Sequence, residues 1–119
     1  MSITPEELVR QQLLYFLINE IKIPSAKIAV EKQIEVNGLK KRFDILVYDD
    51  ASKPLILAEC KAPQIKLTND VFSQIANYNL TMQVNYLLVC NGIDIHFFKI
   101  DFDKKQFQEL DGLLNYIKL

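Results

Sequence analysis

The chain has 119 residues, of which half are hydrophobic and 24% are charged, so it is long enough and apolar enough for a single domain over residues 1–119 with its own core. The average charge content excludes a disordered or fibrous chain, and the net charge of −1 with a pI near 5.8 counts against tight, non-specific binding of nucleic acid by charge alone. The chain has a single histidine, which excludes a zinc site with several histidine ligands. Its two cysteines lie inside apolar runs, which predicts buried, reduced thiols.

The N-terminus predicts a helix and not a targeting segment. Thr4 can cap the helix, Pro5 suits its first position, and Glu7 completes a Thr-x-x-Glu capping box. An apolar stripe then follows at helical spacing as far as Pro24: Leu13, Phe16, Leu17 and Ile21. No basic region precedes an apolar stretch, and no run approaches the roughly 18 apolar residues of a membrane span. We therefore expect a cytoplasmic protein with no membrane partner.

Three strands should follow the first helix. Residues 28–36 alternate with period two, which indicates a half-buried strand. Asn37-Gly38 is a strong hairpin signal, and the next strands are expected at about 41–48 and 54–61.

The second half predicts a helix, two strands and a helix. Thr68 opens a helix with an apolar stripe at Val71, Ile75, Tyr78 and Met82. Residues 85–90 are almost wholly apolar, which is typical of a central strand covered on both faces. A last strand is expected at 93–99 and a C-terminal helix near 106–117. The order α-β-β-β-α-β-β-α predicts an α/β fold with a mixed central sheet, in which a right-handed crossover leaves the third and fourth strands parallel.

Three charged residues lie where strand interiors should be apolar. Alternation places Asp44, Glu59 and Lys61 on one face of an antiparallel pair and turns Cys60 the other way. Two neighbouring carboxylates repel unless a cation lies between them or one binds a proton. Oxygen ligands of this kind suit Mg²⁺ or Mn²⁺, although Asp44 in a structural ion pair with Arg42 or Lys61 is the alternative.

The residues around Asp44 and Glu59 resemble the motifs of a known group of proteins. Phe43-Asp44 and Glu59-Cys60-Lys61 resemble the PD-(D/E)xK nuclease superfamily, with phenylalanine in place of the proline. Together with the blocks at residues 5–11, 42–45, 59–63 and 74–79, they resemble the N-terminal nuclease domain of type I restriction enzyme R subunits. The similarity runs from about Thr4 to Gly92, and it implies a restriction-endonuclease-like core.

The resemblance also implies residue roles. Asp44 and Glu59 would bind Mg²⁺, or alternatively Mn²⁺, together with the backbone carbonyl of Cys60, and Lys61 would be the catalytic lysine. Glu7 would be the acidic residue of the first helix, with Glu6 as the other candidate and capping as the plain structural explanation.

The same comparison suggests contacts to DNA. Gln74 and Tyr78 match a Gln-x-x-x-Tyr motif that helps to place the strand, although a polar flank and a core aromatic would look the same. Lys41, Arg42 and Lys66 could meet phosphates or could simply be solvated.

The leading hypothesis is thus a divalent-metal-dependent DNA endonuclease domain. The alternative is a non-catalytic module that keeps the nuclease fold to bind nucleic acid or protein within a larger complex. The sequence has no Gly-x-x-x-x-Gly-Lys phosphate loop, so a translocase or other restriction-modification subunits would act in trans.

Overall fold

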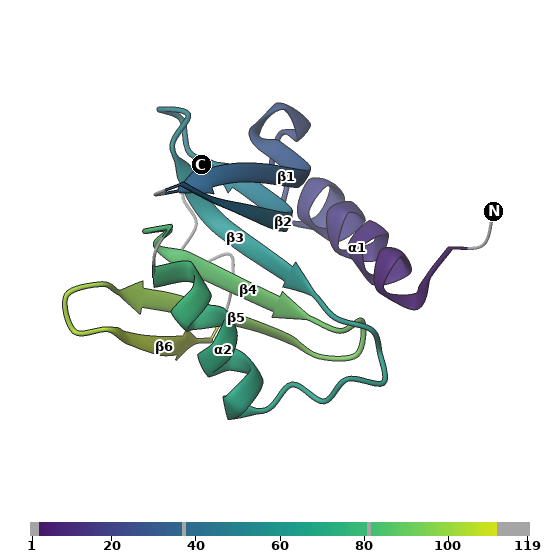
Figure 1. Cartoon of the computed structure of the whole chain (residues 1–119). Coiled ribbons are helices and arrows are strands. Elements are labelled where there is room, and N and C mark those ends of the chain that lie inside the picture. Colours follow the sequence, from purple (N-terminus) through teal and green to yellow (C-terminus); the bar gives the residue numbers. More distant parts are fainter. Residues whose placement is uncertain (1–2, 37, 81, 112–119) are drawn as a thin grey trace.

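The protein is an α/β structure in which a six-stranded mixed sheet carries a helix on each face (Figure 1). The computed structural model describes residues 3–36, 38–80 and 82–111, without the side chains at positions 32, 34, 36, 39, 41 and 78. The elements in chain order are α1 (Pro5–Tyr15), β1 (Ile28–Val36), β2 (Leu39–Tyr48), β3 (Pro54–Cys60), α2 (Asn69–Leu80), β4 (Tyr86–Cys90), β5 (Ile95–Asp101) and β6 (Gln106–Leu110). A π-helical turn, Phe16–Glu20, and a short 3₁₀ turn, Ser25–Lys27, join α1 to β1.

The strands lie in the sheet in the same order as in the chain, from β1 to β6. Neighbouring strands are antiparallel except β3 and β4, which are parallel because α2 connects them across one face of the sheet. The predicted parallel pair and the central position of β4 are therefore confirmed. Within the described part of the chain, no helix combines the length and apolar character needed to cross a membrane.

The start of α1 follows the sequence signals. The backbone N–H of Glu7 donates a hydrogen bond to the Thr4 hydroxyl at 3.1 Å, and Pro5 occupies the first turn. Val9, Leu13 and Leu17 then form the buried stripe that faces the sheet. The cap and the packing together fix where the N-terminal turn of α1 lies.

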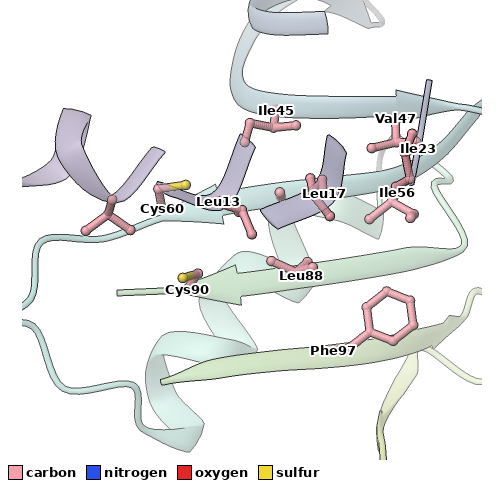
Figure 2. Close-up of a cluster of buried hydrophobic side chains, with 12 residues drawn as sticks. Leu13, Leu17, Ile23, Ile45, Val47, Ile56, Cys60, Leu88, Cys90 and Phe97 are labelled. Atoms are coloured by element: carbon pink, nitrogen blue, oxygen red, sulfur yellow. The ribbon is translucent and has the colours of Figure 1, made fainter. Parts of the chain in front are cut away.

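Each face of the sheet has its own apolar core. The α1-side core is drawn in Figure 2 and contains Val9, Leu13, Leu17, Ile23, Ile45, Val47, Ile56, Ala58, Cys60, Leu88, Cys90 and Phe97. The α2-side core contains Phe43, Leu46, Leu57, Phe72, Ile75, Ala76, Val84, Leu87, Val89, Phe98 and Ile100. Leu88 faces one core and its neighbours Leu87 and Val89 face the other, which shows that β4 is covered on both sides.

The two cysteines are free, buried and opposite each other. Cys60 and Cys90 occupy paired positions on β3 and β4, with both sulfur atoms in the α1-side core (Figure 2). Burial raises the pKa of both thiols above the ordinary value. The expectation of buried reduced thiols is confirmed, and their raised pKa values make them poor nucleophiles.

The predicted C-terminal helix is wrong over its first turn, because residues 106–110 form the edge strand β6. Phe107 and Leu110 are three positions apart, a spacing that places them on one face of a helix but on opposite faces of a strand. In the structure they pack against the α2-side core and the α1-side core, respectively. Phe107 packs edge-on against Phe98 at a ring-centroid distance of 5.4 Å, and the backbone pairs with β5. The rest of that predicted helix, residues 112–117, lies outside the described residues.

The last predicted strand, 93–99, also shifts along the chain. The side-chain oxygen of Asn91 accepts the backbone N–H groups of Ile93 and Asp94, at 2.9 and 2.7 Å, and folds this stretch into a turn. β5 therefore begins at Ile95 and continues to Asp101.

Candidate functional site

The register of β2 and β3 sets two carboxylates side by side. Ile45 pairs with Ala58, so Asp44 and Glu59 come next to each other one step further along the ladder. The backbone N–H of Cys60 donates a 2.8 Å hydrogen bond to Asp44 Oδ2, which orients that carboxylate. The Cys60 thiol points into the α1-side core while Glu59 reaches a surface cleft, so the two neighbours point in different directions as alternation predicted.

The surroundings of Glu59 disfavour the charged form of its side chain. Its burial, and next the negative charge of Asp44, raise the pKa of Glu59 from 4.5 to about 7, whereas the Lys61 ammonium acts in the opposite sense. A carboxyl group with such a pKa holds a proton over much of the neutral range unless a cation replaces that proton. The pair is a place where a proton or a cation is favoured.

A cleft of about 610 Å³ opens at this end of the sheet, between the first turns of α1 and the strands β1 to β3. Its lining is rich in acidic side chains, with two arginines at the same surface: Glu6, Glu7, Glu31, Asp44 and Glu59, with Arg10 and Arg42. Five carboxylates against two guanidiniums make the lining anionic and suited to a cation.

Glu7 performs its capping and site roles with different atoms. Its backbone N–H donates the capping hydrogen bond to the Thr4 hydroxyl. Its carboxylate faces the cleft and accepts hydrogen bonds from Arg10 and Gln11. The hydrogen bond from Arg10 is the main reason why the pKa of Glu7 is lowered. Glu6 lines the same cleft and contributes to the raised pKa of Glu59.

Arg10 and Glu31 belong to the cleft, although sequence reasoning did not select them. Arg10 pairs with Glu7 and lies 3.6 Å from Glu31, which in turn lies 3.4 Å from Arg42. The Glu7-to-Arg10 spacing of three residues on a helix was a usable signal, because side chains at that spacing are neighbours. The polar run from Glu31 to Gln33, which interrupts the alternation of the strand, was another.

The predicted basic and α2 residues lie at different distances from the site. Arg42 lines the cleft and is 70% exposed, so the structure brings it together with Asp44 and Glu59. Lys66, in the loop after β3, and Gln74, on α2, are exposed and do not line the cleft. The side chains of Lys41 and Tyr78 lie outside the described residues, although their backbones belong to β2 and α2.

Lys61 follows β3 directly and is partly buried. Its backbone N–H donates to the Cys90 carbonyl at 2.8 Å and extends the parallel pairing by one step. Its side chain is not part of the cleft lining, but its charge is near enough to lower the pKa of Glu59.

The donor set limits how a metal could be held. Within residues 3–36, 38–80 and 82–111, no three His, Cys, Asp or Glu side chains gather in a group that could hold a metal ion. Asp44 and Glu59 would need a backbone oxygen or solvent to complete a coordination shell.

The comparison with protein families covers most of the chain. The sequence model of the family described as type I restriction enzyme R protein N terminus (HSDR_N) matches residues 5–113. The chain belongs to this family. The match covers α1, the whole sheet and every cleft residue named above, and it relates the function of the chain to restriction enzymes. A search of curated proteins finds no significant match.

Proposed function

We propose that this chain is a divalent-metal-dependent DNA endonuclease domain of the PD-(D/E)xK type, acting within a restriction-modification system. The observation that carries the proposal is the convergence of Asp44 and Glu59 in an anionic cleft, with the pKa of Glu59 raised to about 7. Membership in the R protein N-terminal family supports a nuclease-related role. DNA is the proposed substrate.

The residues present fit a hard divalent cation. Asp44 and Glu59 supply carboxylate oxygens, and the Cys60 carbonyl would supply a third, which is a donor set suited to Mg²⁺ or Mn²⁺. When bound, such a cation polarises the scissile phosphate and lowers the pKa of an attacking water.

Side chains and backbone groups of the chain would position the water and the DNA strand. The Cys60 N–H holds Asp44 in place, and the Lys61 ammonium beside Glu59 would orient the water or stabilise negative charge on the phosphate. Glu7 or Glu6 would add a carboxylate from α1. Arg42, Lys41 and Lys66, with Gln74 and Tyr78 on α2, would guide the DNA strand.

A cleavage assay tests the proposal. Plasmid and single-stranded DNA are incubated with Mg²⁺ or Mn²⁺ and wild type, Asp44→Ala or Lys61→Ala, and each variant should lose at least about 10²-fold in rate. Asp50→Ala and Lys99→Ala are matched controls, because Asp50 lies beyond the far end of β2 and Lys99 is exposed on β5. The controls should cleave at the wild-type rate. Cleavage that survives both site substitutions would overturn the proposal.

A second candidate is a non-catalytic module that binds nucleic acid, or another restriction-modification subunit, with the same surface. The absence of Lys61 from the cleft lining favours it, because a catalytic lysine should reach the reacting atoms. Calorimetric titration with Mg²⁺ separates the candidates: an intact metal site should bind in the wild type and not in Asp44→Asn.

A further inference from the structure

Four side chains of alternating charge form a line along the rim of the cleft. Glu7 on α1 pairs with Arg10, Arg10 lies 3.6 Å from Glu31 on β1, and Glu31 lies 3.4 Å from Arg42 on β2. We call this set the rim chain. It connects three elements that no other described ion pair joins at this end of the sheet.

The two arginines of the rim chain differ from each other. The Arg10 side chain is 14% exposed and is held from both sides by carboxylates, whereas that of Arg42 is 70% exposed. Arg10 is thus held by two carboxylates, whereas most of the Arg42 side chain is open to solvent. Glu31 is the link between them and is itself half exposed, so another anion could take its place without the desolvation of a buried group.

The backbone at Glu31 is unusual for a strand. Among the strand residues that the structure describes, Glu31 is the only one other than glycine with a positive φ, at 50°. Val30 pairs with Ile45 and Lys32 pairs with Phe43, so Glu31 and Asp44 lie at the same level of the β1–β2 ladder, between two paired positions. A conformation that L residues avoid is maintained only where the surroundings enforce it, and such positions gather at functional sites.

We propose that Glu31 is a positioning residue that holds Arg10 and Arg42 together at the mouth of the cleft and occupies the place of a nucleic-acid phosphodiester. The incoming phosphate displaces the Glu31 carboxylate and takes over its charge contacts with Arg10 and Arg42. The Arg10 guanidinium keeps its bidentate pairing with Glu7, which fixes where its remaining donors point. This inference rests on the proposed function, since it names the charged contacts of the strand in that cleft.

Binding without cleavage tests the displacement. Fluorescence anisotropy with a labelled DNA oligonucleotide in EDTA compares wild type, Glu31→Gln and Glu35→Gln. Glu35 is an exposed residue of the same strand, which makes it a matched control. Both variants replace a glutamate by a glutamine and so change the net charge by the same amount. Glu31→Gln should bind at least about fivefold tighter and Glu35→Gln should change affinity less than about twofold. Equal affinities for the two variants, or no binding by wild type, would overturn the inference.

The salt dependence identifies the phosphate contacts. Arg10→Gln and Arg42→Gln should each reduce the slope of log Kd against log salt by about one, whereas Lys99→Gln on β5 should leave it unchanged. Because Arg10 is largely buried, Arg10→Lys serves as a second variant. It should keep the slope and lose affinity, since a lysine ammonium cannot hold the bidentate pairing with Glu7 and contact the phosphate as well. Unchanged slopes in both glutamine variants would refute the phosphate contacts.

The outcome is independent of the cleavage assay. Cleavage that requires Asp44, together with equal binding by Glu31→Gln and Glu35→Gln, would refute the role of Glu31 and leave the nuclease proposal standing. The Glu31 effect without cleavage that depends on Asp44 would support the phosphate contacts and overturn the nuclease.

Discussion

The two ends of the β2–β3 ladder have opposite physical character, although only a few residues separate them. At one end Val47 pairs with Ile56, and both side chains are buried in the α1-side core. At the other end Asp44 and Glu59 lie side by side in an anionic cleft. Burial stabilises the first pair and raises the free energy of the second, because apolar groups gain by leaving water and neighbouring carboxylates lose.

The same pairing register of β2 and β3 determines the arrangement at both ends of the ladder. The same alternation that sends Ile45 and Ala58 into the core brings the next pair, Asp44 and Glu59, together at the cleft. A slip of one residue would turn the core pairs outward, so the stability of the apolar end holds the carboxylates in place. The comparison predicts that the apolar end contributes stability and that the polar end costs stability.

The largest expected effect on stability is in the α1-side core, to which the apolar end of the ladder belongs. Leu88 on β4 is fully buried in the α1-side core, and Leu88→Ala should reduce the free energy of unfolding by about 3 kcal/mol, since it leaves a cavity. Urea unfolding measures the loss. Leu8→Ala, at a position 49% exposed on α1, is the control and should cost less than about 1 kcal/mol. Equal losses would show that the core is not where the stability lies.

At the polar end, removing a charge should stabilise the metal-free protein. The pKa of Glu59 is about 7 in the folded state against 4.5 ordinarily, so between these values the folded state binds more protons and stability falls as pH rises. Glu59→Gln has no carboxylate at this position and should therefore not lose stability in this way as the pH rises. It should match the wild type near pH 4.5 and exceed it by on the order of 2 kcal/mol at pH 8.

The measurement is urea unfolding at a series of pH values from 4.5 to 8 in EDTA. Glu35→Gln removes an exposed carboxylate from β1 and controls for the change in net charge. A difference between Glu59→Gln and wild type that stays constant with pH would contradict the buried, repelled carboxylate.

The smallest effect concerns the backbone of β1. Glycine normally destabilises a strand relative to alanine, but at a φ of 50° alanine is strained and glycine is not. Glu31→Gly should therefore be more stable than Glu31→Ala by about 1 kcal/mol. Both variants lack the carboxylate, so their difference in thermal unfolding reports the backbone alone. At Glu35, on the same strand and without a positive φ, the order should be reversed.

Much of the fold followed from local signals. The Thr4 cap, the Asn37-Gly38 turn signal and the apolar run before Cys90 act within a few residues, and they predicted α1, the β1–β2 pairing and the central strand. The adjacency of Asp44 and Glu59 also followed, because alternation and antiparallel pairing leave little choice.

The errors lie where local signals support two answers. Phe107 and Leu110 fit a helix as well as a strand, and pairing with β5 together with the Phe98 contact decided for the strand. The rim chain was missed for a related reason: Arg10 and Glu31 are 21 positions apart, and only the packing of α1 beside the sheet brings them together.

The sequence by itself thus determined the order of most elements, the family resemblance and the carboxylate pair, because these depend on spacing along one or two neighbouring segments. The tertiary structure alone decided that Arg10 and Glu31 share the cleft with this pair and with Glu7, and that the pKa of Glu59 is raised. Burial and long-range charge contacts depend on how distant segments pack, and no local pattern encodes them.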